Sequence, residues 1–329
     1  MLNLITDVAG LAVGHATDLA LGSGVTAILF DRAAVVSVAV LGGAPGGHNT
    51  GGLEPEMTLA GIDAVVLSGG SVFGLDAAGG VQAALREAGR GLNLRGALVP
   101  LASGAILFDL LNGGDKDWGR FSPYRDLGYA AALAAAPGKF GLGSVGAGTG
   151  ATTATVKGGL GSASGVTRAG HTVGAIVAVN ALGSPLIGDG PWFWAAPFEQ
   201  QAEFGGRGWP KDMPADALTP RLKGGPGTST TIALVATDAT LTKPQAKRLA
   251  MMANDGLARA ILPAHAPMDG DTVFAAATGA RPLESDYDLT EIGQAATIAL
   301  ARAVARGVYE ATALPWPGAQ KSWRERFGD

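Results

Sequence analysis

The sequence lacks cysteine and is poor in histidine, and these absences exclude several kinds of hydrolase. Without cysteine, the chain cannot form disulfides, use a thiolate nucleophile or hold a cysteine-based zinc site. The histidines are His15, His48, His171 and His265, and no pair of them has a metal-ligand spacing such as H-E-x-x-H. We therefore expect neither a metal ion nor another cofactor.

Charged residues and long hydrophobic runs are also scarce. Asp, Glu, Lys and Arg make up 16% of the 329 residues, the net charge is −4, and no basic block occurs, so a nucleic-acid partner is not expected. No apolar stretch of about 18 residues is free of glycine and charge, and the first residues lack a signal-peptide pattern. We expect a cytoplasmic protein with no membrane span. Because 47% of the residues are hydrophobic, we also expect apolar surface to be buried between the subunits of a homo-oligomer.

Hydrophobic periodicity predicts strands and helices in separate groups. Strands are predicted at 25–30, 34–41, 62–67, 172–180, 231–237 and 272–277, and helices at about 74–89, 126–136, 242–261 and 288–311. The polar pair Asp31-Arg32 separates the first two strands in a hairpin-like pattern, and Thr242 with Gln245 forms a capping box. This grouping predicts a single α+β domain with helices packed on sheets, rather than a doubly wound nucleotide-binding fold.

Residues 141–146 match the dinucleotide-binding pattern G-x-G-x-x-G, but their surroundings do not support that function. Gly148 and Gly150 follow the motif, so no helix is expected to begin there. No acidic residue occurs between Leu127 and Gly188 to bind a ribose. We therefore reject a nucleotide cofactor.

The most informative stretch joins a Gly/Pro-rich loop to an apolar strand, in the order Gly227-Thr228-Ser229-Thr230-Thr231-Ile232. A chain that cleaves its own backbone to expose an N-terminal Thr or Ser needs such a junction. The loop lets the scissile bond be approached, and the strand holds the new terminus. A freed N-terminal Thr carries a hydroxyl nucleophile and an α-amine, whose unperturbed pKa near ~8 lets it act as a base. The alternative is an ordinary Thr-rich strand entry.

Two further residues can contribute to such a site. Lys157 stands in the acid-free window, followed by Gly158-Gly159, where it can stabilise an oxyanion or a carboxylate. The alternative is an ordinary solvated lysine. Asn180 ends a predicted strand, where its amide can donate to an oxyanion or can form a turn.

Asp269 and Asp271 flank Gly270 directly before a predicted strand. In an extended backbone both side chains point to one face. Close carboxylates repel, so one pKa rises unless a cation lies between them. That cation can be an α-ammonium at Thr230 or the ammonium of Lys157, and an acidic turn is the alternative. Together the nucleophile, the lysine, the amide and the carboxylates form a complete set for amide hydrolysis without His, Cys or metal.

These residues also carry a resemblance that runs through most of the chain. The sequence resembles the DmpA-type family of self-processing N-terminal-nucleophile hydrolases, which includes L-aminopeptidase/D-esterases, β-peptidyl aminopeptidases and the nylon-oligomer (6-aminohexanoate) endohydrolase. The matching segments are 6–15, 42–46, 67–77, 146–150, 157–159, 230–232, 236–238 and 268–272.

The resemblance implies a four-layer αββα sandwich, whose precursor cleaves between Ser229 and Thr230 into chains 1–229 and 230–329. It also implies a tetramer of such processed heterodimers. Thr230 matches the family's nucleophile, and Lys157 and Asn180 match its active-site Lys and Asn. The paired aspartates of the nylon-oligomer branch correspond to Asp269 and Asp271.

Three departures from the family pattern stand out. The peptidase branch uses Ser as nucleophile and lacks the aspartate pair. The nylon-oligomer branch has Asn before the cut, where this chain has Ser229. That branch also has an active-site Tyr in a region that corresponds to 123–128 here, where Ser122 stands at the matching position and Tyr124 is a nearby candidate.

The sequence therefore predicts a self-cleaving amide hydrolase that acts through an acyl-enzyme on small peptides or nylon-type oligoamides. In this mechanism Thr230 Oγ attacks, its α-amine takes the proton, Asn180 holds the oxyanion, and Lys157 and the aspartates tune the amine. The alternatives are an aminopeptidase for peptides of β- or D-residues, an acyltransferase like ornithine acetyltransferase, and an uncleaved binding protein.

Overall fold

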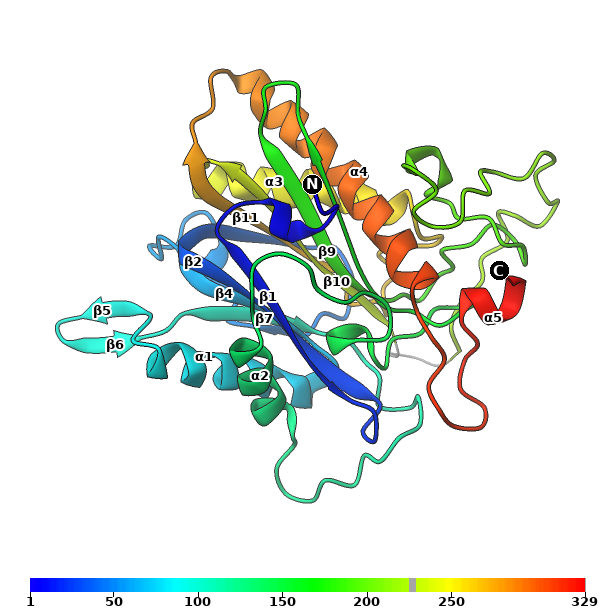
Figure 1. The fold of residues 1–329 in the computed structure, drawn as a ribbon, viewed down its shortest axis with the longest axis horizontal. Coiled ribbons are helices and arrows are strands. Elements are labelled where there is room, and N and C mark those ends of the chain that lie inside the picture. Colours follow the sequence, from blue (N-terminus) through cyan, green and yellow to red (C-terminus); the bar gives the residue numbers. More distant parts are fainter. Residues whose placement is uncertain (225–228, 329) are drawn as a thin grey trace.

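The computed structural model describes residues 1–224 and 229–328, and its strands and helices form stacked layers (Figure 1). The strands are β1 (Leu11–Asp18), β2 (Ser23–Val40), β3 (Gly47–His48), β4 (Ile62–Ser68), β5 (Leu92–Leu94), β6 (Ala97–Val99), β7 (Ala102–Ile106), β8 (Leu160–Val166), β9 (Thr172–Asn180), β10 (Thr230–Ala239) and β11 (Thr272–Arg281). The α-helices are α1 (Ala77–Glu87), α2 (Tyr124–Leu133), α3 (Lys243–Ala258), α4 (Asp286–Tyr309) and α5 (Trp323–Phe327).

One long strand, β2, connects the two sheet layers. The hydrogen-bonded order is β3-β7-β4-β2-β11-β10-β9-β8, and β1 pairs with β2 outside this path. Residues 25–34 of β2 pair with β4, whereas residues 35–40 pair with β11, so the strand leaves one layer and enters the other. The sheet is mixed, because β10 and β11 are parallel and β9 and β10 are antiparallel.

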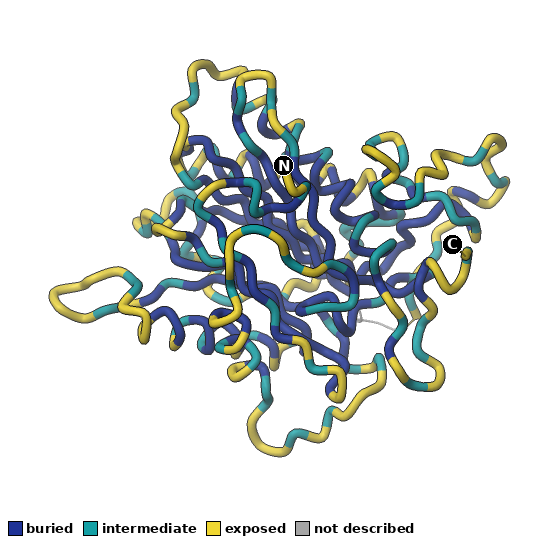
Figure 2. The backbone as a smooth tube through the Cα atoms, viewed as in Figure 1, coloured by how far each residue is buried: buried dark blue, intermediate teal, exposed yellow. Residues whose placement is uncertain are grey.

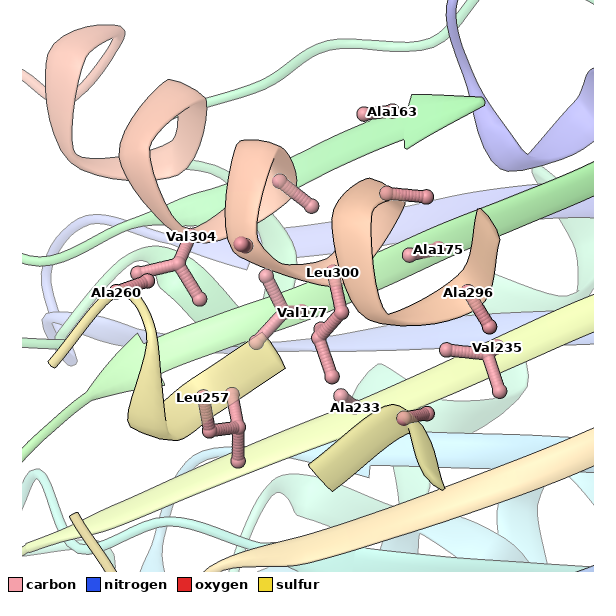
Figure 3. Close-up of a cluster of buried hydrophobic side chains, with 14 of the residues drawn as sticks. Ala163, Ala175, Val177, Ala233, Val235, Leu257, Ala260, Ala296, Leu300 and Val304 are labelled. Atoms are coloured by element: carbon pink, nitrogen blue, oxygen red, sulfur yellow. The ribbon is translucent and has the colours of Figure 1, made fainter. Parts of the chain in front are cut away.

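Side chains alternate between two hydrophobic cores along β10. Ile232 and Leu234 belong to the core between the two sheet layers, whereas Ala233 and Val235 belong to the core beneath α3 and α4. Figure 3 shows α4 residues such as Leu300 over β9 and β10 in this second core. A third core lies between β2, β4 and the helices α1 and α2. The resulting order of layers, α–β–β–α, confirms the predicted sandwich.

Small residues let helix α4 approach the sheet closely. A Cβ added to Gly161 on β8 would lie 1.8 Å from the carbonyl oxygen of Ala303, and Gly307 on α4 faces the same glycine. Only glycine fits a contact of backbone on backbone. The abundance of glycine is therefore partly a packing requirement. The strands beneath α4, such as β9 and β10, are buried along almost their whole length (Figure 2).

The structure confirms most of the predicted elements and corrects two. The predicted hairpin at 25–30 and 34–41 is wrong, because β2 continues through Asp31-Arg32 with a register shift against β4 between Leu29 and Ala34. The exposed polar pair marks the crossing between layers, not a turn. The helix predicted at 74–89 starts as a 3-10 helix, Ser71–Asp76, and becomes α-helical only at Ala77.

The capping box predicted for the third helix is present. Thr242 accepts a hydrogen bond from the Gln245 backbone, and the Gln245 side chain accepts one from the Thr242 backbone. The sequence does not predict the short strands β3, β5 and β6, nor β1, β7 and β8, whose alternation is obscured by Gly, Ser and Ala. Among the described helices, none is long and apolar enough to cross a membrane.

We predict that Leu300→Ala lowers the free energy of unfolding by about 2–5 kcal/mol, because it opens a cavity in the core under α4. Leu133→Ala, on the exposed face of α2, is the matched control and should change stability little. Denaturant unfolding of both variants measures the difference. Equal effects would contradict the assignment of this core.

Candidate active site

Thr230 is the first residue of β10 and lies directly opposite Asn180, the last residue of β9. Thr230 is two residues from Ile232, and Asn180 is two residues from Ala178, both of which belong to the core between the sheets. Because residues two apart on a strand point to the same face, the side chains of Thr230 and Asn180 also face that gap. Thr230 is buried, and its hydroxyl donates a hydrogen bond to the carbonyl oxygen of Ser229. The hydroxyl is thus next to the peptide bond at which self-cleavage is predicted. Residues 225–228, the rest of the predicted loop, lie outside the described residues.

The backbone of Gly270 packs against the Thr230 side chain. A Cβ at Gly270 would lie 2.6 Å from Thr230 Oγ1 and 3.0 Å from its methyl carbon. A larger residue would therefore displace Thr230. This contact requires glycine between the two aspartates and brings the aspartate segment against the start of β10.

The aspartates contact Ser229 and Thr231, the residues on either side of Thr230. Asp269 forms a parallel bridge with Ser229, and its carboxylate accepts hydrogen bonds from the backbone N–H groups of Gly270 at 3.0 Å and Leu182 at 3.4 Å. Asp271 accepts a bond of 2.9 Å from the backbone N–H of Thr231. Both carboxylates are buried, so the alternative, an acidic turn exposed to solvent, does not apply.

Burial and the neighbouring Asp271 carboxylate raise the pKa of Asp269 to about 7. The second oxygen of Asp271 lies 2.9 Å from Nδ1 of His265 and also accepts the His265 backbone N–H. Burial lowers the pKa of His265, but the Asp271 carboxylate outweighs it and the net shift is upward. The pair thus consists of one carboxylate beside an imidazole and one that takes up a proton near neutral pH.

Asn180 has its amide held in one orientation. Its Oδ1 accepts from the Thr152 backbone N–H at 3.0 Å and from Lys223 Nζ at 2.8 Å, and its Nδ2 donates to the Phe108 carbonyl at 2.9 Å. The residue is fully buried at the strand end. It is therefore a fixed donor and acceptor beside Thr230, and not a surface turn former.

Lys157 is buried, so the solvated alternative is wrong. Its ammonium donates to the carbonyl oxygens of Gly148, Ala151 and Gly158 at 3.1, 2.7 and 2.8 Å. Burial lowers its pKa to about 7, although Asp109 opposes this shift. Lys157 connects to the nucleophile indirectly, because it forms a β-bridge with Thr152, which in turn donates to Asn180.

Tyr124 lies in the core under α1 and α2, where its hydroxyl donates to Ser23 Oγ at 3.0 Å. Ser23 donates to Asp109 at 2.6 Å, and burial raises the pKa of both Asp109 and Tyr124. Tyr124 is thus linked through Ser23 to a carboxyl group that lies beside the cavity. The structure gives Tyr124 a supporting position, because its hydroxyl reaches Asp109 only through Ser23 and contacts none of Thr230, Asn180 and Lys157 in the hydrogen bonds of the described residues.

Sequence reasoning missed three residues of this site: Lys223, Asp109 and His265. Lys223 lies in the aperiodic stretch before the cut, Asp109 follows the unpredicted strand β7, and His265 was set aside for want of a metal spacing. A charged residue directly after an apolar run was the available signal for Asp109. No signal in the sequence marked Lys223 or His265.

A cavity of about 580 Å³ opens beside Lys223 and Asp109. Its lining includes Asp109, Asn112, Thr152, Lys157, Lys223 and Trp316. A space of this size accepts a small-molecule or peptide-sized ligand. The walls place two lysines and one carboxyl group where such a ligand would lie.

Comparison with known proteins identifies the family. The sequence pattern of peptidase family S58 matches residues 3–321. The chain belongs to peptidase family S58. An uncharacterized aminopeptidase of Mycobacterium tuberculosis is 40% identical over 94% of this chain and 94% of its own length. The 6-aminohexanoate-oligomer endohydrolase of a Kocuria strain is 29% identical over 83% of this chain and 74% of its own length.

Solved structures of two aminopeptidases share the fold. The L-aminopeptidase D-Ala-esterase/amidase of Ochrobactrum anthropi, described as a variant of the Ntn hydrolase fold, superposes with a TM-score of 0.72 at 23% identity, over 98% of this chain and 92% of that one. A β-aminopeptidase of a Burkholderia species gives 0.71 at 24% identity, over 99% and 92%. The predicted family and fold class are confirmed.

We predict a pH-dependent stability difference for Asp269→Asn. Because the folded-state pKa of Asp269 is raised from 3.8 to about 7, the folded chain binds this proton more tightly than the unfolded chain. Stability contributed by this group is therefore lost as pH rises from about 4 to about 7. Because asparagine cannot ionise, the free energy of unfolding of the variant should rise relative to that of the parent across this pH window. Above the window the difference between the two free energies should stay constant.

Denaturant unfolding at several pH values measures this difference. Asp212→Asn, at an exposed position, is the matched control and should follow the parent at every pH. A difference for Asp269→Asn that stays flat between pH 4 and 7 would show that the carboxyl group is ionised throughout.

Proposed function

We propose that this chain is an amide hydrolase that first cleaves its own backbone between Ser229 and Thr230 and then uses Thr230 as an N-terminal nucleophile. The observation that supports this most is the Thr230 hydroxyl on the Ser229 carbonyl, between Asn180 and a buried aspartate pair. Membership of a peptidase family supports the reaction class.

In the first step, Thr230 Oγ attacks the carbonyl carbon of Ser229. A C–O bond forms, the C–N bond breaks, and the hydroxyl proton passes to the departing nitrogen, so the peptide becomes an ester. The α-amine is still part of the peptide bond and cannot be the base. Asp269, whose backbone pairs with Ser229 and whose pKa is about 7, is the group that we assign to take up and return this proton. Water then hydrolyses the ester to give chains 1–229 and 230–329.

In the second reaction, the new α-amine of Thr230 replaces Asp269 as the base. Thr230 Oγ attacks the substrate carbonyl, the amine accepts its proton and gives it to the leaving amine, and an acyl-enzyme remains. Asp271 holds the adjoining Thr231 backbone, and the carboxylate pair raises the pKa of the Thr230 ammonium. The Asn180 amide stabilises the oxyanion, a contribution of typically ~3 kcal/mol per donor.

The relatives indicate amide substrates of two kinds, peptides and oligoamides. The greater identity to an aminopeptidase favours small peptides, whereas the aspartate pair favours the oligoamide branch. Acyl transfer to an amine requires the same acyl-enzyme, and dependence of turnover on an added amine separates it from hydrolysis. An uncleaved binding protein would remain one chain on long incubation.

We predict that the purified chain yields two fragments, the smaller beginning Thr-Thr-Ile-Ala-Leu. Thr230→Ala should remain folded, uncut and inactive, and Thr230→Ser should still be cut, because the chemistry needs only the oxygen. Thr231→Ala is the matched control, since the Thr231 hydroxyl has no hydrogen-bond partner in the described part of the chain, and it should mature. Intact mass spectrometry measures all four proteins, and an active Thr230→Ala enzyme would falsify the mechanism.

We predict that Asp269→Asn and Asp271→Asn each slow the appearance of the two fragments and the hydrolysis of amide substrates. Where the substituted carboxyl group transfers the proton, the rate should fall by about 100-fold or more. Asp271→Asn also places an amide against the donors of His265, which should loosen the start of β10. Asp212→Asn is the control. If both variants mature and turn over at the parental rate, with an unshifted pH profile, the pair has no part in catalysis.

We predict that the protein assembles as a tetramer of processed heterodimers. Large apolar side chains such as Leu111, Phe121 and Leu218 are at least 76% exposed, and burial between subunits would remove them from water. Light scattering at micromolar concentration measures the mass. A single-chain mass would contradict the assembly without affecting the assignment of Thr230.

A further inference from the structure

His265 occupies a strained position in the loop between α3 and β11. Its backbone has a φ of +57°, a left-handed conformation that is uncommon for residues other than glycine. In this conformation its N–H donates to Asp271 Oδ2 at 2.9 Å, and its Nδ1 lies 2.9 Å from the same oxygen. A strained backbone persists only where the surrounding contacts hold it, and here both contacts are with one buried carboxylate.

These contacts favour the imidazolium form of the ring. A neutral nitrogen lone pair at this distance from a carboxylate oxygen would be repelled, so Nδ1 carries a proton. The backbone carbonyl of Asn254, in α3, also favours the protonated ring. Only the doubly protonated imidazole has a donor for each of two acceptors. The His265 side chain is 20% exposed, so solvent can supply the second proton.

The buried aspartate pair needs a cation, and the uncut chain offers few. The α-ammonium of Thr230 does not yet exist, because its nitrogen is still part of a peptide bond. Lys157 has all three of its N–H donors on backbone carbonyls. Lys223 attracts Asp269, but its ammonium is bound by other oxygens. Among the described residues, His265 is therefore the cation in direct contact with the pair.

We propose that His265 is a positioning residue for the self-cleavage: its imidazolium neutralises Asp271 and so leaves the Asp269 carboxylate free to accept the Thr230 proton at neutral pH. The inference rests on the proposed function and names the group that sets its pH range. In that step the proton passes from Thr230 Oγ to Asp269 and then to the departing nitrogen, while His265 keeps its own proton throughout. His265 thus acts through Asp271 rather than on the reacting atoms.

The charge of His265 determines how readily the pair takes up a proton. Two buried carboxylates repel, so the pair titrates as a unit, and it binds its first proton more tightly when no cation is near. The imidazolium weakens that binding from one side of Asp271, and the Thr231 N–H does so from the other. Without the imidazolium the pair would hold a proton at neutral pH, and Asp269 could no longer act as a base.

One other titratable group of the described chain faces this cluster. Lys223 has a pKa of about 7, and Asp269 is among the groups that favour its charged form. Lys223 is present in every variant compared below, so a difference between their pH profiles reports on residue 265. The remaining neighbours are backbone groups that do not titrate near neutral pH: the N–H groups of Leu182, Thr231 and Gly270 and the carbonyl of Asn254.

The first experiment follows self-cleavage as a function of pH. The full-length chain is labelled in a short cell-free pulse, translation is stopped, and samples are shifted to buffers from acid to alkaline pH. The rate of fragment appearance should rise with a midpoint near the Asp269 pKa of about 7. His265→Gln should move this midpoint upward by about one pH unit or more and reach a similar rate above it. His265→Lys, which keeps a positive charge, should keep the parental midpoint.

His48→Gln is the matched control, because His48 is also half-exposed and forms no ion pair within the described residues. It should follow the parent at every pH. A purely structural role of His265 would lower the rate equally at all pH values in both His265 variants. That result, or an unmoved midpoint in His265→Gln, would overturn the inference while leaving the self-cleavage intact.

The second experiment measures the charge of the cluster without any cleavage. The full-length Thr230→Ala chain with isotope-labelled histidine rings gives NMR signals from only four histidines, and His265→Gln assigns the one of interest. We expect His265 to titrate above 6.5, and its midpoint to fall when Asp271→Asn is added and to fall less with Asp269→Asn. A midpoint that neither substitution moves would overturn the inference. The expected falls, combined with a parent chain that never cleaves, would remove the proposed function and this role with it, while the ion pair stands.

Discussion

The pairing of β10 between β9 and β11 is the constraint on which the site depends. Both faces of β10 are buried, one between the sheets and one under α3 and α4, so its register cannot slip without exposing a core. This register sets Thr230 opposite Asn180 and against Gly270. The residues before β11 are placed by the same parallel pairing, which brings the aspartate pair to the backbone on both sides of the proposed cut.

Charged groups are buried around the start of β10. Lys157 and Asp269 are buried, Lys223 is part-buried in the cavity wall, and each of the three has a pKa of about 7. Carbonyl and amide groups, rather than direct ion pairs, hold the two lysines. Such groups change protonation near neutral pH with little cost, which suits proton transfer but destabilises the fold relative to apolar side chains. The large cores on either side of β10 offset this cost.

The fold could be predicted from the sequence, and the principal residues proposed for the site could be located, because each left a local signal. The strand 172–180 was predicted with the bounds that β9 has, and the β10 strand ended within two residues of the prediction. Thr230 and Asn180 stand at strand ends, and Asp269 lies just before β11, where polar residues interrupt apolar runs. Resemblance to a family supplied their roles.

The rest of the site depends on contacts that no local pattern encodes. Lys223 and Asn180 are separated by 43 residues and meet only through the irregular segment between them. His265 reaches Asp271 because the chain turns back before β11. The continuity of β2 across Asp31-Arg32 was missed because a strand that passes from one layer to another looks, in one dimension, like two strands and a turn.

The central claim, that Thr230 is the nucleophile, is tested most directly by trapping the acyl-enzyme. Mature protein is mixed with excess 6-aminohexanoyl or alanyl p-nitroanilide, quenched in acid during turnover, and analysed by mass spectrometry of both chains and of their peptides. The account predicts an acyl group on chain 230–329, attached to its first residue. An acyl group on another residue, or turnover that releases p-nitroaniline with no acylated chain at any time, would contradict it.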